Sequence, residues 1–138
     1  MTLERPYSKP LEQLSSVGLR PTSQRMILAK LLFDGTRRHV TAEMLHYEVL
    51  KSHKKVSLAT IYNTLHLFTK LGLLREIIVD SDCSYFDTNT TNHHHFYRED
   101  TRELIDIDES DIQIGHLPKP PQGSQITRVD MVVRTKRN

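Results

Sequence analysis

The segment from Ser57 to Leu71 reads SLATIYNTLHLFTKL and predicts an amphipathic helix. Ser57 is a suitable N-cap, and Gly72 is placed to end the helix. The apolar residues recur at spacings of three and four, as one buried side of an α-helix requires: they are Leu58, Ile61, Leu65 and Phe68. The other side carries small and polar side chains near the helix start, where a recognition helix meets the major groove of DNA: Ser57, Ala59, Thr60, Tyr62 and Asn63.

These side chains have the chemistry of base and phosphate recognition. Threonine can touch a thymine methyl, asparagine can bond adenine, and tyrosine can bond phosphate or pack on thymine. Lys54 and Lys55, just before the helix, are candidates for phosphate contacts. Arg20 and Arg25 flank the start of an earlier helix, where they could lie near the DNA backbone or a minor groove. The alternative for the helix side chains and for the basic residues is an ordinary solvent-exposed surface without a DNA partner.

The elements around this helix predict a winged helix-turn-helix domain. Helices are expected over 10–17, from Thr22 to Asp34, and from Thr41 onward. Their buried stripes are expected at Met26, Ile27, Leu31 and Leu32 in the second helix, and at Leu45 and Val49 in the third. Strand-like runs at 73–79 and 84–86, separated by a turn, predict a hairpin that would be the wing. A generic α+β domain is the alternative.

The rest of the chain predicts a second, smaller domain. Residues 88–92 are polar and are expected to form a hinge. Strands are expected over 95–99, 103–107 and 125–134, with little helix to cover them, so pairing with a second copy would bury the apolar face. The predicted fold class is therefore α+β: a winged-helix DNA-binding domain over 1–87, then a small α/β dimerisation domain over 93–138.

The run His93-His94-His95 is the strongest chemical signal in that second domain. Neutral imidazole is the commonest protein ligand of transition metals. In a strand, His93 and His95 would share one face and His94 would lie on the other. The alternative is a polar strand edge with ordinary hydrogen bonds.

Composition narrows the class of protein. The chain has 138 residues and a net charge of +2, divided into +6 over residues 1–70 and −4 over residues 71–138. A basic N-terminal half suggests a polyanionic partner such as double-stranded DNA. The sequence has no run long and apolar enough for a membrane span and no apolar signal core, so the cytoplasm is the expected location.

Four motifs together resemble the ferric uptake regulator family: LRPTSQR at 19–25, HVTAE at 39–43, VSLATIYNTL at 56–65 and GLL at 72–74. The resemblance covers roughly residues 10–110. It implies a DNA-binding winged helix, a hinge and a dimerisation domain that carries metal sites. It also implies that Tyr62 contacts thymine and that Arg20 probes a minor groove.

The same resemblance implies a metal site. His39 and Asp87 match metal-ligand positions of the family, and with His93 and His95 they would form one site. Such a site would bridge the two domains, so that metal binding could alter their relative angle and hence DNA affinity.

One departure from the family pattern points to a particular branch. Arg98 and Thr101 occupy positions where most members have cysteines, and Cys83 is the only cysteine, so no Cys-based structural zinc site is expected. With the triple histidine at 93–95 and a Pro-rich C-terminal segment, the chain resembles the iron response regulator branch. That resemblance implies haem ligation by His93, His94 and His95, control of iron uptake and haem synthesis genes, and a haem-synthesis enzyme as a possible haem donor.

The expected function is thus a homodimeric, iron-responsive repressor that uses haem or Fe(II), Mn(II) or Zn(II). One alternative is a generic Mn/Zn-responsive or peroxide-responsive repressor of the same family. A small metalloenzyme using Asp87 or Asp106 is disfavoured, because the sequence has no H-E-x-x-H motif, nucleophile elbow or phosphate-binding glycine loop.

Overall fold

The computed structural model describes residues 8–138, which divide into two compact units. The N-terminal unit ends at Thr90, and the C-terminal unit comprises Thr91–Asn138. The division falls inside the polar 88–92 segment. None of the helices formed by residues 8–138 has the length and apolar character needed to cross a bilayer.

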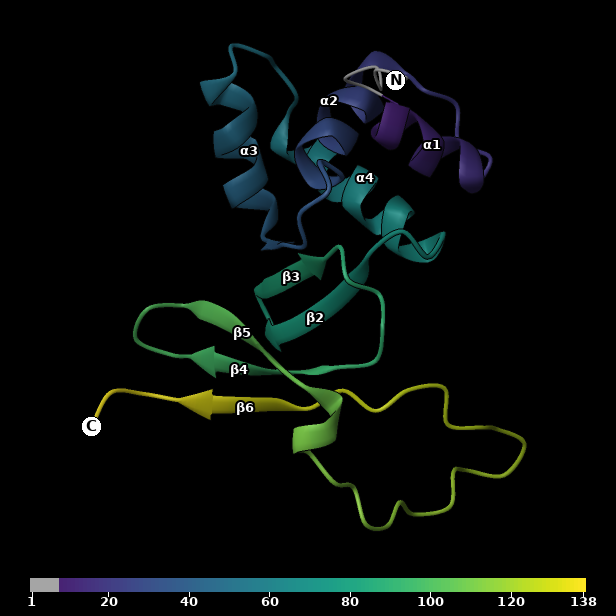
Figure 1. Cartoon of the computed structure of the whole chain (residues 1–138), viewed down its shortest axis with the longest axis vertical. Helices are drawn as coiled ribbons and strands as arrows, with labels where there is room; N and C mark the ends of the chain where they lie inside the picture. The colour runs from purple at the N-terminus through teal and green to yellow at the C-terminus, as the bar shows by residue number, and fades with distance from the viewer. Residues whose placement is uncertain (1–7) are drawn as a thin grey trace, which may run out of the picture. The chain divides into compact units, whose positions relative to one another are not determined.

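The N-terminal unit is a winged helix (Figure 1). Its helices are α1 (Ser8–Ser16), α2 (Ser23–Leu32), α3 (Ala42–Lys51) and α4 (Leu58–Lys70), and its wing strands are β2 (Arg75–Asp80) and β3 (Cys83–Asp87). A two-residue strand, β1 (His39–Val40), pairs antiparallel with β3 and completes a sheet of order β1-β3-β2. The sequence did not predict β1, because two residues are too short for a periodic signal.

Side-chain caps fix where the helices begin. Thr22, Thr41 and Ser57 each accept a hydrogen bond from the backbone amide three residues later, which satisfies one of the free N–H groups at a helix start. Gly72 follows α4 with φ of 84°, a conformation that costs glycine little. The predicted starts of these three helices and the end of α4 are therefore confirmed.

The core lies where the helices meet above the wing. Ile61, Leu65 and Phe68 of α4 are fully buried, as predicted, whereas Leu58 is only partly buried. The predicted stripe of α2 needs correction. That helix buries Leu28, Ala29 and Leu32, while Met26, Ile27 and Leu31 are partly buried against the core. Because α2 packs on both α1 and α3, the buried side of this helix is broader than the predicted stripe and is centred on different residues.

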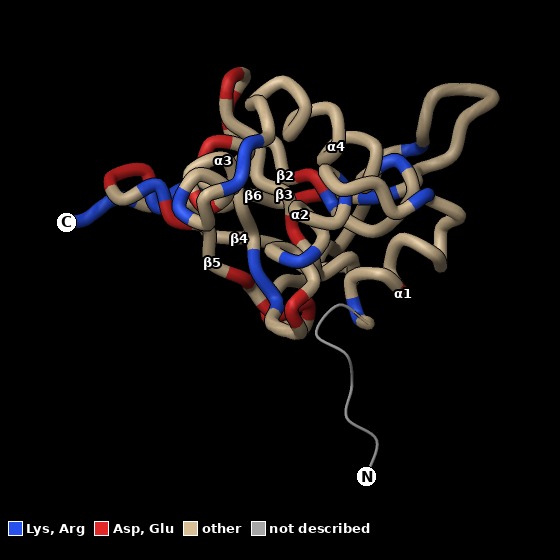
Figure 2. The backbone as a smooth tube through the Cα atoms, turned by 90° about the horizontal axis from the view of Figure 1, so that it is seen from above, with Lys and Arg blue, Asp and Glu red and all other residues tan. Residues whose placement is uncertain are grey.

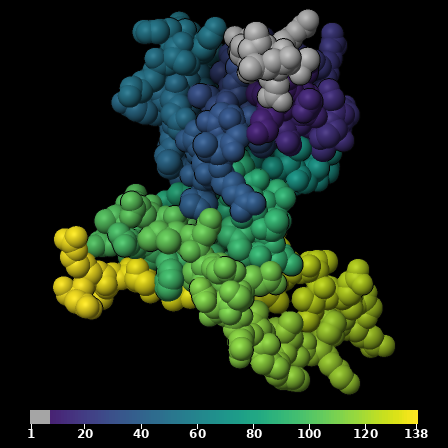
Figure 3. Space-filling model, viewed as in Figure 1, coloured from purple at the N-terminus to yellow at the C-terminus, as the bar shows by residue number. Residues whose placement is uncertain are grey.

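The C-terminal unit is a three-stranded sheet of order β5-β4-β6. Its strands are β4 (His94–Arg98), β5 (Glu103–Ile107) and β6 (Val132–Thr135), with β4 antiparallel to β5 and parallel to β6. After the short 3₁₀ turn η1 (Glu109–Asp111), a long irregular loop leads to β6 (Figures 1 and 3). The strand expected over 125–134 is thus mostly loop, because pairing with β4 begins only at Val132.

One face of this sheet is apolar and exposed. Ile105, Phe96 and Val133 are register partners across β5, β4 and β6, so their side chains lie in one row on the same face. Phe96 is 38% exposed and Ile105 is 37% exposed. This is the uncovered apolar face that the sequence predicted.

Candidate functional site

The N-terminal half of α4 presents the side chains that the sequence singled out for DNA contact. Ser57, Ala59 and Asn63 are exposed, and Thr60 and Tyr62 are half-buried. Lys54 and Lys55 are exposed in the turn that precedes the helix. All seven thus lie on or directly before one helix start, where backbone N–H groups also favour anions.

Two hydroxyls at this helix start are already paired with each other. The Ser57 hydroxyl donates to Thr60 Oγ1 at 2.9 Å and accepts from the Thr60 backbone amide at 3.1 Å. The Thr60 hydroxyl proton is not used in this pair, so it can donate to a phosphate oxygen or a base acceptor. Ser57 therefore serves as cap, and its contact with DNA would be made by an already oriented hydroxyl.

Tyr62 is held from two sides. Its hydroxyl donates to Glu43 Oε1 of α3 at 2.6 Å, and its ring stacks on His66 one turn later, with centroids 6.4 Å apart. The hydrogen bond to Glu43 raises the pKa of Tyr62 to about 12, with smaller contributions from burial and from the charges of Glu43 and Cys83. The phenol therefore stays protonated and oriented at neutral pH.

Arg20 and Arg25 lie together before and at the start of α2. The Arg25 Nη1 group donates to the Arg20 carbonyl oxygen at 3.1 Å, and the Arg20 side chain is exposed. Lys and Arg residues are spread over several elements of the chain rather than confined to one helix (Figure 2). The structure therefore brings Arg20 and Arg25 together, and leaves the Arg20 guanidinium accessible.

Two of the predicted metal ligands are neighbours in the wing sheet. His39 of β1 and Asp87 of β3 are register partners, and a ligand atom of each lies within 4.8 Å of the other. One Asp87 oxygen, Oδ1, accepts from the Asn89 backbone amide at 2.8 Å, which fixes the carboxylate orientation. An imidazole beside an oriented carboxylate is a common pair of ligands for a divalent ion.

The other two predicted ligands converge on a carboxylate within the C-terminal unit. His95 Nε2 lies 3.2 Å from Asp106 Oδ1, and His93 Nε2 lies 3.4 Å from the same oxygen. The two rings are only 4.4 Å apart between centroids. His93 and His95 therefore share one face, as predicted, and Asp106 of the neighbouring strand joins them.

The remaining ring nitrogen of His93 has the partner that a metal-bound histidine needs. Its Nδ1 lies 2.6 Å from the Thr91 carbonyl oxygen, which can only accept, so Nδ1 carries the proton. In the neutral ring, the Nε2 lone pair then faces Asp106. A histidine that donates one ring N–H to a carbonyl while the other nitrogen binds metal is the usual arrangement at metal sites.

His94 is engaged differently from its two neighbours. Its Nδ1 accepts a hydrogen bond from the Met131 backbone amide at 3.1 Å, at the point where the chain enters β6. The neutral ring must then carry its proton on Nε2, so neither nitrogen offers a lone pair to a metal. His94 thus acts here as a structural acceptor that attaches the start of β6 to β4.

The spacing of His93, His95 and Asp106 fits a divalent ion. Ligand atoms bound to one ion at bond lengths of about 2.0–2.2 Å lie about 3.0–3.4 Å apart. The distances from Asp106 Oδ1 to the two imidazole nitrogens, 3.2 and 3.4 Å, fall in that range. The nitrogen and oxygen ligands suit Mn(II), Fe(II) or Zn(II).

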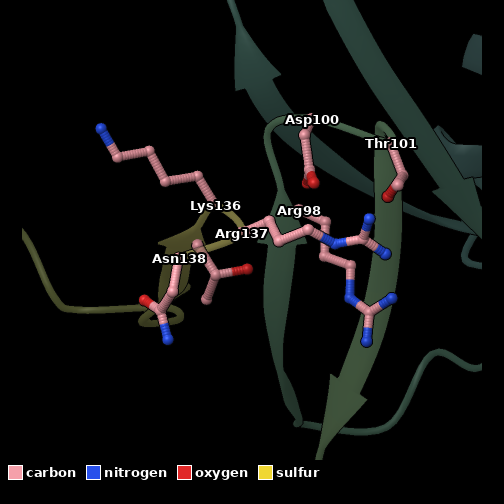
Figure 4. Close-up of a pocket in the computed structure, with 7 residues that line it drawn as sticks. Arg98, Asp100, Thr101, Lys136, Arg137 and Asn138 are labelled. Carbon is pink, nitrogen blue, oxygen red and sulfur yellow. The ribbon is translucent and has the colours of Figure 1, made fainter.

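The positions that correspond to the family's cysteines line a pocket in the C-terminal unit. This pocket of about 340 Å³ lies beside the β4–β5 turn and the end of β6 (Figure 4). Its lining residues are Arg98, Asp100, Thr101, Thr135, Lys136, Arg137 and Asn138. Three cationic side chains and no thiolate make this pocket unfavourable for a metal cation.

Sequence reasoning missed two partners. Asp106 was considered only for an enzyme, although pairing the expected strands 95–99 and 103–107 around their turn already places it opposite His95. Glu43 appeared only as the last residue of the HVTAE motif, with no role of its own. No sequence signal could have linked it to Tyr62, because that contact depends on how α3 packs against α4.

Comparison with known proteins adds the family. The model of the ferric uptake regulator family matches residues 16–133. A peroxide-responsive repressor, PerR, of Staphylococcus aureus (strain Mu50 / ATCC 700699) is 30% identical over 106 residues, which cover 77% of this chain and 71% of the relative.

Solved structures show the same fold. The ferric uptake regulator from Pseudomonas aeruginosa with manganese has a TM-score of 0.70 at 22% identity, covering 93% of this chain and 97% of that one. The regulator from Vibrio cholerae has a TM-score of 0.72 at 22% identity, covering 91% and 98%. A zinc-bound manganese uptake regulator has a TM-score of 0.65 at 20% identity, covering 95% and 100%.

Proposed function

The chain belongs to the ferric uptake regulator family, and on that premise we propose that it is an iron-responsive repressor whose affinity for operator DNA depends on a metal held by His93 and His95. Members of this family are metal-responsive, homodimeric DNA-binding transcription regulators and not enzymes. The metalloenzyme alternative is therefore set aside. The proposal concerns which effector this chain senses and which side chains bind it.

The arrangement around Asp106 is the observation that carries the metal proposal. Two imidazoles converge on one carboxylate oxygen at 3.2 and 3.4 Å, and His93 already has its second nitrogen bonded to a carbonyl. A partial coordination shell with its supporting hydrogen bond in place would have this arrangement. Manganese in the Pseudomonas aeruginosa structure and zinc in the manganese uptake regulator indicate the kind of ion to test.

His39 and Asp87 are proposed as further ligands of the same ion. Support for one ion taking ligands from both units comes from the family resemblance of the sequence, and the pairing of His39 with Asp87 within the wing sheet is compatible with it. An ion with ligands on both units would favour one relative orientation of them. Metal binding would then be linked to DNA binding.

Metal titrations of single variants test the metal proposal. Each of His39→Ala, His93→Ala and His95→Ala should weaken Mn(II) binding by at least about tenfold, because each removes one ligand of a single ion. His116→Ala, an exposed histidine of the C-terminal loop, is the matched control and should bind as the wild type does. If His39→Ala binds normally while His93→Ala does not, the ion lies in the C-terminal unit alone.

Haem is the second candidate effector, favoured by the unbroken run His93-His94-His95. Ligation by His94 would require its bond to the Met131 amide to break, since that bond occupies the nitrogen lone pair. A haemin titration therefore separates the candidates. Haem sensing predicts a Soret shift that disappears when all three histidines are replaced by alanine, and iron-ion sensing predicts no specific shift. A haem-synthesis enzyme would be a partner, as haem donor, only if the titration shows haem sensing.

Mn/Zn-responsive and peroxide-responsive regulation are the alternatives within the family. They are distinguished by measuring DNA binding of protein loaded with Fe(II), Mn(II) or Zn(II), before and after treatment with peroxide. Iron sensing predicts that Fe(II) supports the response at the lowest concentration. Loss of DNA binding after peroxide treatment only in the Fe(II)-loaded protein would instead support peroxide sensing, as in the Staphylococcus aureus relative.

For DNA, we propose that the face of α4 and its basic surroundings make the contacts. Exposed polar side chains at one helix start, flanked by lysines, are the observation that supports this. The proposed contact residues are Arg20, Arg25, Lys54, Lys55, Ser57, Ala59, Thr60, Tyr62 and Asn63. A gel-shift titration of Tyr62→Ala should show weakened operator binding in a protein that is still folded at the assay temperature.

A further inference from the structure

Glu43 is an acidic residue placed beside a surface proposed to bind a polyanion. It lies in the first turn of α3, exposed to solvent, and its Oε1 atom accepts the Tyr62 hydroxyl at 2.6 Å. A charge-assisted bond of this length is among the stronger side-chain hydrogen bonds. An anion in this position opposes phosphate binding, so its contribution to DNA recognition needs an explanation other than affinity.

The direction of the bond determines what Tyr62 can still offer. A phenol has one proton and two lone pairs, and the proton is directed to Glu43. The oxygen can therefore accept a hydrogen bond from a base, and the ring can pack on a thymine methyl. It cannot donate to a phosphate oxygen, to thymine O4 or to guanine O6 while the bond to Glu43 is in place.

In the major groove this restriction selects among base pairs. The amino groups of adenine and cytosine are the donors that an acceptor can bond, and the thymine methyl is the apolar surface a ring can contact. The Tyr62 ring also stacks on His66, with an interplanar angle of 19°, which favours one orientation of the ring. The side chain reads DNA in one orientation with one kind of polar contact.

We propose that Glu43 is a specificity-determining positioning residue for DNA recognition: it takes the Tyr62 proton, so that Tyr62 reads bases only through its ring and lone pairs, and its charge repels phosphate from this part of the surface. The inference rests on the proposed role of α4 in DNA binding. Glu43 thus lowers the affinity for arbitrary sequences while it preserves the affinity for the correct one, which is the usual effect of a repulsive group on selectivity.

In-vitro selection from a random-sequence duplex library tests the proposal with the full-length, Mn(II)-loaded protein. The variants are Glu43→Gln, Glu43→Ala and Tyr62→Phe, with Glu12→Gln of α1 as a matched control for the loss of one exposed negative charge. The wild type and Glu12→Gln should enrich the same motif. Both Glu43 variants should bind mixed-sequence duplex about three- to tenfold more tightly at moderate salt, because both lose the charge. Only Glu43→Ala also removes the acceptor of the Tyr62 proton, so it should relax base preference at one position of each half-site, whereas the amide oxygen of Glu43→Gln can still accept that proton and should keep the motif.

Combining the changes shows whether Glu43 acts through Tyr62. In a Tyr62→Phe background, Glu43→Ala should no longer change base preference, although the gain in mixed-sequence binding should persist because it depends on charge alone. An unchanged motif in Glu43→Ala, or unchanged mixed-sequence binding in both Glu43 variants, would overturn the proposal. If the wild type itself enriches no motif, the proposed role of α4 fails, and the two results are therefore distinguishable.

A spectroscopic readout tests the hydrogen bond without DNA. An ultraviolet titration of the tyrosines measures the pKa of Tyr62, with Tyr62→Phe used to assign the signal. This pKa should be about 12 in the wild type and closer to its ordinary value of 10.0 in Glu43→Ala. A purely structural role of Glu43 would not move this titration in a folded variant. An unchanged Tyr62 titration in Glu43→Ala would show that the bond is not formed in solution, and would overturn the proposal.

Discussion

Three adjacent histidines show how one residue type takes different roles within a few ångströms. His93 and His95 direct Nε2 toward Asp106, whereas His94 uses Nδ1 to accept the Met131 amide. The alternation of side chains along a strand separates the roles, because His94 must point to the other face. The three histidines are therefore not equivalent as candidate ligands, because the hydrogen-bond partner of each ring decides which nitrogen has a lone pair to offer.

Replacing His94 should separate stability from metal binding. His94→Ala leaves the partly buried Met131 amide without its acceptor, so we expect a loss of about 1 kcal/mol in the free energy of unfolding, with Mn(II) affinity within about threefold of wild type. His93→Ala should show the reverse pattern. Urea unfolding and metal titration of both variants check this, and a large loss of Mn(II) affinity in His94→Ala alone would contradict the assignment.

The Tyr62–Glu43 bond should also make stability depend on pH in the alkaline range. The pKa of Tyr62 is raised to about 12 in the folded protein from an ordinary value of 10.0, chiefly by the bond to Glu43. The contribution of this bond to the free energy of unfolding is complete below pH 10 and is lost as the pH rises to 12. The reason is that Tyr62 loses its proton at a lower pH in the unfolded chain than in the folded protein. Urea unfolding of wild type and Glu43→Ala between pH 9 and 11.5 should show a smaller decline in the variant. Tyr47→Phe, an exposed tyrosine of α3, should decline as the wild type does.

At the scale of elements, Arg38 joins three parts of the N-terminal unit. Its guanidinium donates twice to Glu48 of α3, at 2.9 and 2.6 Å, and once to the Leu31 carbonyl near the end of α2. The hydrogen bonds to Glu48 raise the pKa of Arg38 above its ordinary value. Its backbone amide also donates to Thr88 Oγ1, directly after β3, so the start of β1 is held as well.

Loss of this connection should destabilise the winged helix. Arg38→Ala removes a partly buried, two-point ion pair and the cap on Leu31, so we expect a loss of about 1–3 kcal/mol in the free energy of unfolding. The neighbouring Arg37→Ala is the matched control, since Arg37 is exposed, and it should change stability by less than about 0.5 kcal/mol. Equal unfolding curves for the two variants would show that the ion pair contributes nothing measurable.

The elements differ in how well the sequence predicted them. Helix starts at Thr22, Thr41 and Ser57 followed from local capping chemistry, and the wing hairpin followed from a local change of period. The face buried by α2 did not follow, because it is set by packing against two other helices. The strand expected over 125–134 was also too long, because a parallel partner is chosen by tertiary contacts that a single strand does not encode.

The same distinction holds for the candidate site. His93 and His95 were predicted as ligands from the run of histidines, and His39 and Asp87 through the family resemblance. The local pairing of each couple is visible within its own unit. Asp106 and Glu43 required the structure, since each is brought to its partner by pairing or packing of separate elements.

At the scale of the whole molecule, charge and assembly act together. The net charge of +6 over residues 1–70 includes the proposed DNA-contact lysines and arginines, while residues 71–138 carry −4. The basic first half of the chain attracts the DNA backbone, whereas the acidic second half does not attract it. A dimer would double the basic surface presented to one operator, so its affinity should depend steeply on salt.

The exposed apolar row of the C-terminal sheet should be the surface that holds two copies together. Ile105→Asp places a charge beside Phe96 in that row, so we expect sedimentation to report a mass near 16.1 kDa in place of about twice that value. Ile78→Asp is the matched control, because Ile78 is 66% exposed on the wing, and it should remain dimeric. A monomer can bind only one half-site. Ile105→Asp should therefore also bind an operator with two half-sites about a hundredfold more weakly. A dimeric Ile105→Asp protein would mean that the subunits meet through another surface, and that this apolar row is covered in some other way.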